Sequence, residues 1–183
     1  MEQNPPTSLW SLGHSTLTLA EFLELCRAHA LERIVDVRRY PTSRRLPHFA
    51  REGLALALPR AGLSYVHLVD LGGHREERPG SPHTALVGAF RGYADHMETP
   101  AFAAAVTQLL RLARERRTAV MCAERSPAEC HRRLLCDRLV SLGASVVHLR
   151  RDAPPEPHRL PPEARPDGGR LVYAAPRQAG LFD

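Results

Sequence analysis

The sequence contains no lysine, so arginine supplies all 25 of its strongly basic side chains. A guanidinium group presents a planar fork of donors, whereas a lysine ammonium is a compact point charge. Any phosphate or carboxylate that this chain binds is therefore expected to be held by bidentate arginine contacts. The formal net charge of +5 is compatible with an anionic partner but does not identify one.

Long apolar runs are missing as well. No stretch approaches the roughly 20 apolar residues of a membrane-spanning helix. The N-terminal residues MEQNPPTSLW have neither the basic region nor the apolar run of an export signal. The chain has only four cysteines (Cys26, Cys122, Cys130 and Cys136), which fits a reducing compartment. These absences predict a soluble, cytoplasmic protein without a membrane partner.

The 183 residues, 43% of them hydrophobic, suit one globular domain. Short apolar runs rich in branched residues alternate with longer segments of helical period. The expected strands are 9–13, 33–39, 64–73, 118–124 and 145–151, and the expected helices are 16–30, 51–62, 86–117 with a break at Thr99–Pro100, and 126–143. This alternation predicts an α/β domain with a mostly parallel sheet of about five strands and helices on both faces.

The composition changes after Arg151. Proline is dense through Pro166, and neither the helical nor the strand period continues. We therefore expect a single domain over residues 1–151, followed by an extended Pro-rich tail over residues 152–183.

Polar groups lie at the carboxyl ends of four of the expected strands. In chain order they are His14, then Asp36 and Arg38, then Asp70 in the segment Asp70–Gly73, and finally the segment Cys122–Arg125. In open α/β sheets, ligands bind outside the carboxyl ends of the strands. The convergence of four strand ends therefore predicts a functional site at this edge of the sheet.

The stretch CAERSPAECHRR, residues 122–133, concentrates two cysteines, two glutamates, a histidine and three arginines. One interpretation is a zinc site that draws its ligands from Cys122, Cys130, His131 and His14, although this spacing is not the usual paired-cysteine knuckle. A second is a nucleophilic Cys122 whose pKa is lowered by the N-terminus of a helix that begins near Ser126. A third makes both cysteines small buried hydrophobic residues. No cofactor is firmly predicted.

We therefore expect an active site in which Glu124 and Cys122 are the main catalytic candidates. Asp36 and His14 would assist, and Glu124 would act as general acid or base if the pocket raises its pKa. The candidates for binding an anionic substrate are Arg38, Arg125, His131, Arg132, Gly72 and Gly73. Asp36 and Arg38 share a strand face, so a purely structural ion pair is the alternative for these two.

A loop rich in arginine follows the second expected strand. Arg39, Arg44 and Arg45 surround the aromatic Tyr40 in this loop. Basic side chains interleaved with an aromatic ring can follow a phosphate backbone and stack a base. The loop is a nucleic-acid-binding candidate, and an ordinary solvated loop is the alternative.

Several motifs together resemble the family catalogued as domain of unknown function 488. They are GHST, VDVRRYPTSRRLPHF, LGG and MCAERSPAECHRRLL, and the resemblance runs from about Ser8 to Arg151. It implies an α/β domain whose signature residues are His14, Asp36, Arg38, Gly72, Cys122, Glu124, Cys130, His131 and Arg132. It implies no reaction, and fold analogy does not supply one.

The chain ends in QAGLFD, which is similar to the bacterial sliding-clamp-binding peptide. Gln178, Leu181 and Phe182 match that peptide, whereas Ala179 departs from it because leucine is commoner there. The resemblance implies that these three residues bind the DNA polymerase sliding clamp. Leu181 and Phe182 folding back onto the domain is the alternative.

The pocket and the tail together predict a DNA-processing or DNA-repair enzyme. It would act hydrolytically on a damaged base or nucleotide, in the manner of a glycosylase or nuclease, with DNA and the sliding clamp as partners. One alternative is a cysteine-dependent enzyme on a small anionic metabolite. Another is a non-catalytic module that binds nucleotides or nucleic acid.

Overall fold

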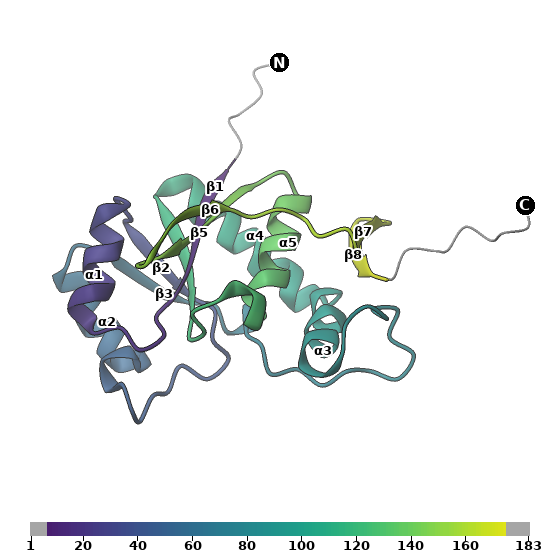
Figure 1. The fold of residues 1–183 in the computed structure, drawn as a ribbon, viewed down its shortest axis with the longest axis horizontal. Helices are drawn as coiled ribbons and strands as arrows, with labels where there is room; N and C mark the ends of the chain where they lie inside the picture. The colour runs from purple at the N-terminus through teal and green to yellow at the C-terminus, as the bar shows by residue number, and fades with distance from the viewer. Residues whose placement is uncertain (1–6, 175–183) are drawn as a thin grey trace, which may run out of the picture.

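A six-stranded sheet forms the centre of the protein in the computed structural model, which describes residues 7–174 (Figure 1). The strand order is β3-β2-β4-β1-β5-β6. The strands are β1 (Ser8–Gly13), β2 (Arg33–Asp36), β3 (Ser64–His67), β4 (Thr118–Cys122), β5 (Ser145–Arg150) and β6 (Ala153–Pro157). The first five are parallel, and β6 pairs antiparallel with β5. The predicted α/β class with a mostly parallel sheet is confirmed.

Residues 7–174 form five helices, and four of them cover the two faces of the sheet. They are α1 (Leu19–Ala28), α2 (Arg51–Arg60), α3 (Gly88–Met97), α4 (Pro100–Glu115) and α5 (Arg132–Ser141), with short 3-10 turns η1 (Pro47–Phe49), η2 (Val69–Leu71) and η3 (Pro127–Glu129). α1 and α2 lie on one side of the sheet, and α4 and α5 lie on the other (Figure 1). No helix within residues 7–174 is long and apolar enough to cross a membrane.

Strand β4 shows how the sheet separates two hydrophobic cores. Ala119 and Met121 belong to the core under α1 and α2, whereas Val120 and Cys122 belong to the core under α4 and α5. This alternation follows from the two-residue period of a strand. All five residues of β4 are buried, as expected for a central strand of a parallel sheet covered on both faces.

Helix starts follow the sequence signals. Thr18 and Glu21 form a capping box at the start of α1, in which each side chain accepts a hydrogen bond from the other residue's backbone N–H. Thr99 caps α4, and Pro100 occupies the first turn. The expected helix from Ser126 is shorter than predicted. Ser126 caps only the turn η3, because Cys130 is extended, and α5 begins at Arg132.

The sequence boundary at Arg151 needs a correction, because the chain remains folded beyond it. β6 extends the sheet, and β7 (Ala164–Asp167) and β8 (Arg170–Tyr173) form a hairpin that buries Leu171 and Tyr173. The proline content of β6, APPEP, disguised it in the sequence. An edge strand tolerates proline because half of its backbone groups lack a neighbouring strand.

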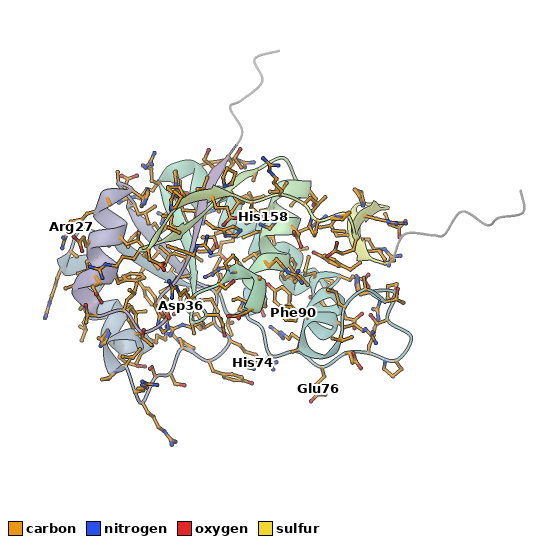
Figure 2. All side chains as sticks on the ribbon, in the orientation of Figure 1. Arg27, Asp36, His74, Glu76, Phe90 and His158 are labelled. Atoms are coloured by element: carbon orange, nitrogen blue, oxygen red, sulfur yellow. The ribbon has the colours of Figure 1, made fainter. Side chains whose placement is uncertain are left out.

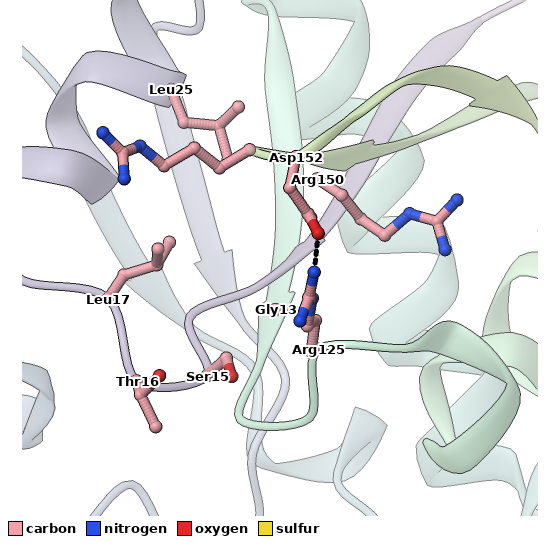
Figure 3. Close-up of a pocket in the computed structure, with 9 residues that line it drawn as sticks. Gly13, Ser15, Thr16, Leu17, Leu25, Arg125, Arg150 and Asp152 are labelled. Carbon is pink, nitrogen blue, oxygen red and sulfur yellow. Dashed lines mark ion pairs between the residues drawn. The ribbon is translucent and has the colours of Figure 1, made fainter.

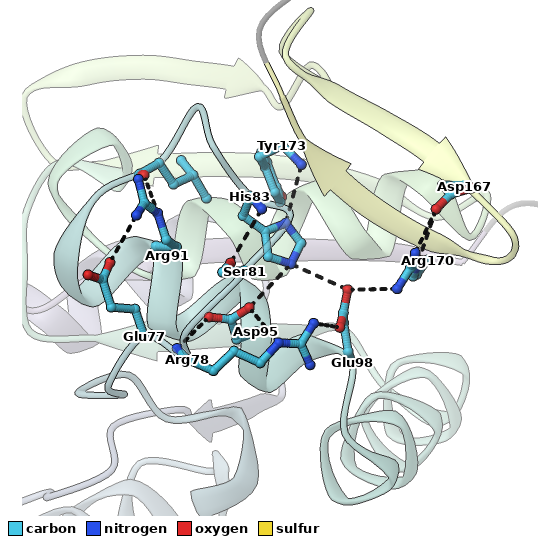
Figure 4. A network of polar contacts seen from close by, with 11 residues as sticks. Glu77, Arg78, Ser81, His83, Arg91, Asp95, Glu98, Asp167, Arg170 and Tyr173 are labelled. Carbon is cyan, nitrogen blue, oxygen red and sulfur yellow. Dashed lines mark hydrogen bonds and ion pairs between the residues drawn. The ribbon is translucent and has the colours of Figure 1, made fainter.

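Charged side chains attach the hairpin to α3 and to the loop before it (Figure 4). Glu98 pairs with Arg78 at 2.6 Å and with Arg170 at 3.3 Å. Arg78 also pairs with Asp95 at 3.4 Å. The backbone adds a contact in which the Ala85 N–H donates to the Tyr173 carbonyl over 3.0 Å. The hairpin is thus part of the domain and packs beside the helices on the α4 and α5 side.

Candidate functional site

The chain changes direction across the sheet between the neighbouring strands β1 and β4. From β1 it passes to α1 on one face, and from β4 it passes to α5 on the other. Such a switch point leaves a crevice between the two departing loops, and this is where open α/β sheets bind ligands. Two backbone hydrogen bonds continue the β1–β4 pairing past the strand ends: His14 N to Cys122 O, 3.0 Å, and Ser15 N to Ala123 O, 2.8 Å.

A cavity of about 150 Å³ opens at this crevice. Its lining residues are His14, Arg38, Arg39, Tyr40, Thr42, Ser43, His74, Cys122, Ala123, Glu124 and His131. They come from the ends of β1, β2 and β4, from the loop after β3 and from the start of α5. Seven predicted site residues therefore meet in one place.

Cys122 and Glu124 face each other at the end of β4. The Cys122 thiol donates to Oε2 of Glu124 over 2.9 Å. Its other neighbours are the Cys130 thiol and the His131 imidazole, whose Nδ1 lies 3.8 Å from each sulfur. The extended conformation of Cys130 after η3 brings the second thiol into this group.

The His131 imidazole is fixed in one tautomer. Its Nε2 lies 3.0 Å from the Val37 carbonyl oxygen, which can only accept, so Nε2 carries the proton. Nδ1 is then left with its lone pair directed towards the two thiols. The Tyr93 ring packs against the imidazole with centroids 4.9 Å apart. The sequence alone did not reveal the contact between His131, at the start of α5, and Val37, just after β2.

The protonation of the site differs from the sequence expectation. Hydrogen bonding with Cys130 and burial raise the pKa of the Cys122 thiol well above its ordinary value. Burial alone would also raise the pKa of Glu124, but hydrogen bonds from the Cys122 and Cys130 thiols hold it below its ordinary value. At neutral pH the site therefore holds a protonated Cys122 and an ionised Glu124. Glu124 is poised as a base, and its pKa is not raised as an acid role would require.

Asp36 does not line the cavity but holds Arg38 in place. Its carboxylate accepts from Arg38 Nε at 2.9 Å and from Arg38 Nη2 at 2.6 Å. It also accepts from the Tyr65 hydroxyl at 2.8 Å. Asp36 lies inside the domain, whereas His74 lies on an outer loop (Figure 2). The alternative of a structural Asp36–Arg38 pair thus describes Asp36 well, while Arg38 itself reaches the cavity wall.

His14 is neutral and is engaged by its neighbours. Its Nδ1 lies 3.0 Å from the Ser15 carbonyl oxygen, and its Nε2 lies 3.3 Å from Arg38 Nη1. Because a guanidinium only donates, Nε2 accepts and Nδ1 carries the proton. Burial, followed by the charge of Arg38, lowers the pKa of His14 to about 4. The ring also stacks on Phe49 at 4.2 Å. His14 therefore orients the Arg38 guanidinium.

Arg132 and Arg125 do not line this cavity. Arg132 is 1% exposed, and its Nη2 donates to the backbone carbonyls of Glu124 and Arg125, so it supports the loop after β4. Arg125 pairs with Asp152 at a second cavity of about 390 Å³ (Figure 3). Ser15, Thr16, Arg150 and Arg151 also line that cavity, which borders the other side of the β1–α1 turn.

Gly72 and Gly73 serve packing at the site. A Cβ at Gly73 would lie 2.7 Å from His131 Nδ1, so glycine leaves room for the imidazole. A Cβ at Gly72 would lie 2.6 Å from the Arg39 backbone. Both were predicted to bind substrate, and neither is among the residues that line the cavity.

The arginine-rich loop divides into two parts. Arg39 and Tyr40 line the cavity, and Tyr40 is 60% exposed at its rim. Arg44 and Arg45 are exposed on the same loop, beyond the cavity.

Sequence reasoning missed Thr42, Ser43, Ala123 and His74 as lining residues. His74 has a positive φ of 56°, which is uncommon for a residue other than glycine. The pair Gly72–Gly73 just before it was the available signal for an unusual turn.

A second cluster of cysteine and histidine side chains includes a residue of α5. It consists of Cys136, His148 and His158. Here the Tyr173 hydroxyl donates to Asp137 over 2.8 Å, His158 Nε2 lies 2.8 Å from the same carboxylate, and His158 Nδ1 lies 2.8 Å from His148 Nε2. The chain of hydrogen bonds links α5, β5 and the C-terminal hairpin. Gln178, Leu181 and Phe182 lie outside the described residues.

A comparison with protein families matches residues 18–139 to the family described as domain of unknown function DUF488. Because the match covers more than half of the 183 residues, the chain belongs to this family. His14 precedes the matched segment, whereas Asp36, Cys122 and His131 lie within it. The comparisons with curated proteins and with solved structures gave no match.

Proposed function

We propose that this protein is a DNA-processing or DNA-repair enzyme that hydrolyses a glycosidic or phosphodiester bond at a damaged base or nucleotide. The observation that carries the proposal is the Glu124 carboxyl group in the wall of a cavity that also holds the buried guanidinium of Arg38. A carboxylate base and a fixed cation are the two groups that attack by water on an anionic substrate requires.

The roles follow from the contacts. Glu124 accepts the proton of the attacking water, because its carboxylate lies in the cavity wall. Arg38 stabilises negative charge that develops on the substrate. It is already oriented by Asp36 and His14, so little reorganisation is needed during the reaction. Tyr40, exposed at the rim, is placed to stack a base.

Arginines in and near the cavity support a nucleic-acid substrate. Arg39, Arg44 and Arg45 follow β2. Arg125, Arg150 and Arg151 line the adjoining cavity of about 390 Å³. A phosphate backbone that crossed this edge of the sheet would meet several of these arginines. The C-terminal QAGLF peptide would tether the enzyme to the sliding clamp on DNA in the cytoplasm.

A cysteine-dependent enzyme acting on a small anion is the second candidate, because Cys122 lies in the wall of a small cavity. The protonation of Cys122 argues against it, since the thiolate is the nucleophile and its formation is disfavoured here. This candidate predicts inactivation by alkylation of Cys122 at neutral pH and no role for residues 178–183.

The first experiment measures binding of the full chain to the bacterial sliding clamp, with and without residues 178–183. Loss of binding on truncation supports the tether, and no binding of the intact chain removes it. The second screens wild type and Glu124→Gln against duplexes that carry single damaged bases. Turnover that is abolished in Glu124→Gln supports the proposal. Binding without turnover, unchanged in Glu124→Gln, would instead identify a non-catalytic binding module.

A further inference from the structure

Three zinc-type ligand atoms lie together in the wall of the cavity. The sulfurs of Cys122 and Cys130 and a ring nitrogen of His131 all lie within 4.8 Å of one another. Cys122 ends β4, whereas Cys130 and His131 precede α5, so two separate segments converge on one point. Thiolate sulfur and imidazole nitrogen are the preferred ligands of zinc.

The distances between these atoms suit one metal ion. A tetrahedral zinc ion, with a Zn–S bond of about 2.3 Å and a Zn–N bond of about 2.05 Å, separates the sulfur from the nitrogen by about 3.6 Å. Both thiol sulfurs lie 3.8 Å from Nδ1 of His131. A shift of about 0.2 Å would bring both pairs to the ideal value, within the tolerance expected for such a site.

The surroundings prepare two of the three ligands, His131 and Cys130, for a metal. The Val37 carbonyl oxygen accepts a hydrogen bond from the Nε2–H of His131 over 3.0 Å. Histidines that bind a metal are usually oriented by such a bond from the other ring nitrogen. The Arg132 backbone N–H donates to the Cys130 sulfur over 3.4 Å, a contact that stabilises a thiolate. The missing side chain of Gly73 leaves space for the imidazole.

We propose that Cys122, Cys130 and His131 bind a zinc ion whose fourth position faces the cavity, beside Glu124. Three protein ligands and one open position are the arrangement of a catalytic zinc site. Binding replaces the two thiol protons, which leave to solvent. The inference deepens the proposed function by naming the group that activates water, and only this catalytic role rests on that function.

Glu124 accepts a proton early in the reaction and returns it to the leaving group. Water at the open position transfers a proton to the Glu124 carboxylate, and the resulting hydroxide attacks the electrophilic carbon or phosphorus of the substrate. The glutamic acid then returns the proton to the leaving group, so one water is consumed overall. Zinc held by one histidine and two cysteines, with a glutamate that is not a ligand, activates water in nucleobase deaminases. Release of ammonia from a base therefore belongs among the reactions to be assayed.

The cluster of Cys136, His148 and His158 is less suited to zinc binding than the cluster of Cys122, Cys130 and His131. Its histidine nitrogens already face each other across a hydrogen bond of 2.8 Å, and His158 is further bound to Asp137. It nevertheless supplies the matched control, because a zinc ion bound there would depend on Cys136.

The test is to purify the full chain without a histidine tag and to measure its metal content by elemental mass spectrometry. We expect about one zinc ion per chain in wild type. Cys130→Ser and His131→Ala should reduce zinc to background, whereas Cys26→Ala and Cys136→Ala should retain it. Circular dichroism establishes that each variant is folded.

Cobalt provides a second readout. Adding Co²⁺ to the reduced, metal-free wild type should produce thiolate-to-cobalt charge-transfer absorption, and Cys130→Ser should lose it. Zinc that survives in Cys130→Ser but is lost in Cys136→Ala would overturn the proposal, as would a wild type that binds neither metal. Bound zinc without turnover of any damaged duplex would leave the metal site standing and refute the proposed function. Hydrolysis that depends on Glu124 but proceeds in a zinc-free chain would support the proposed function and refute the metal site.

Discussion

The buried pair of Asp36 and Arg38 should make each partner indispensable to stability. Asp36 is fully buried and Arg38 is 5% exposed. The Asp36 carboxylate accepts three hydrogen bonds from Arg38 and one from Tyr65. Removing either partner leaves an uncompensated buried charge, which costs about 3–5 kcal/mol. For a chain of this size, that cost lowers Tm by about 6–20 °C.

The experiment is a double-mutant cycle that compares Asp36→Leu, Arg38→Met and the double variant with wild type. Each single replacement should cost about 3–5 kcal/mol. The double variant removes both charges and should cost no more than either single one. Urea unfolding, followed by circular dichroism, gives the free energy of unfolding and its denaturant slope for each protein.

Additive costs would refute the reasoning. If the double variant lost about 6–10 kcal/mol, the sum of the single losses, the two charges would not be coupled. A control pair on the surface, Arg111 and Glu115, has a contact of 2.8 Å but is largely solvated. Replacing Arg111 with alanine should cost less than about 1 kcal/mol.

Three further predictions concern the same edge of the sheet. Gly13→Ala should destabilise the fold by about 1–3 kcal/mol in thermal unfolding, because the added Cβ would overlap the Glu124 carbonyl oxygen and lie 2.7 Å from the carbonyl carbon. An unchanged Tm would show that the loop moves aside at no cost. The free energy of unfolding should fall by about 3 kcal/mol from pH 6.5 to pH 4, because unfolded His14 binds a proton near pH 6.5 and folded His14 only near its pKa of about 4. Urea titrations of His14→Asn should show a shallower fall; an equal slope would assign the effect to other groups. Replacing Arg44 and Arg45 with alanine should reduce the slope of log DNA affinity against log salt concentration by about two units, whereas replacing Arg111 and Arg116 should not. Fluorescence anisotropy measures these affinities. A slope equal to that of wild type would remove Arg44 and Arg45 from the DNA interface.

The strands and helices of the parallel core were predictable because their signals are local. β4 reads as a buried apolar run, and α1 carries its capping box in four consecutive residues. β6 was missed because its proline content opposes strand propensity, and only its position at the sheet edge makes that content acceptable.

The site was predictable in its location but not in its chemistry. The rule for parallel sheets places His14, Arg38 and Cys122 at one edge without any knowledge of distances. The raised pKa of Cys122 and the lowered pKa of Glu124 depend on Cys130, which approaches only because α5 starts later than its serine cap suggested. Such a contact is set by tertiary packing and has no signature in the spacing.

The order of strands also constrains how the protein is made. β4 lies between β1 and β2, although more than eighty residues separate it from β2 in the chain. While the first half of the chain leaves the ribosome, β1 and β2 lack the strand that joins them, and their edges stay open to other chains. The crevice between β1 and β4 does not exist until β4 inserts. A chain interrupted before Thr118 would therefore expose unpaired edges and lack the wall of the cavity that β4 and His131 supply, so chaperone protection should matter most before β4 is synthesised.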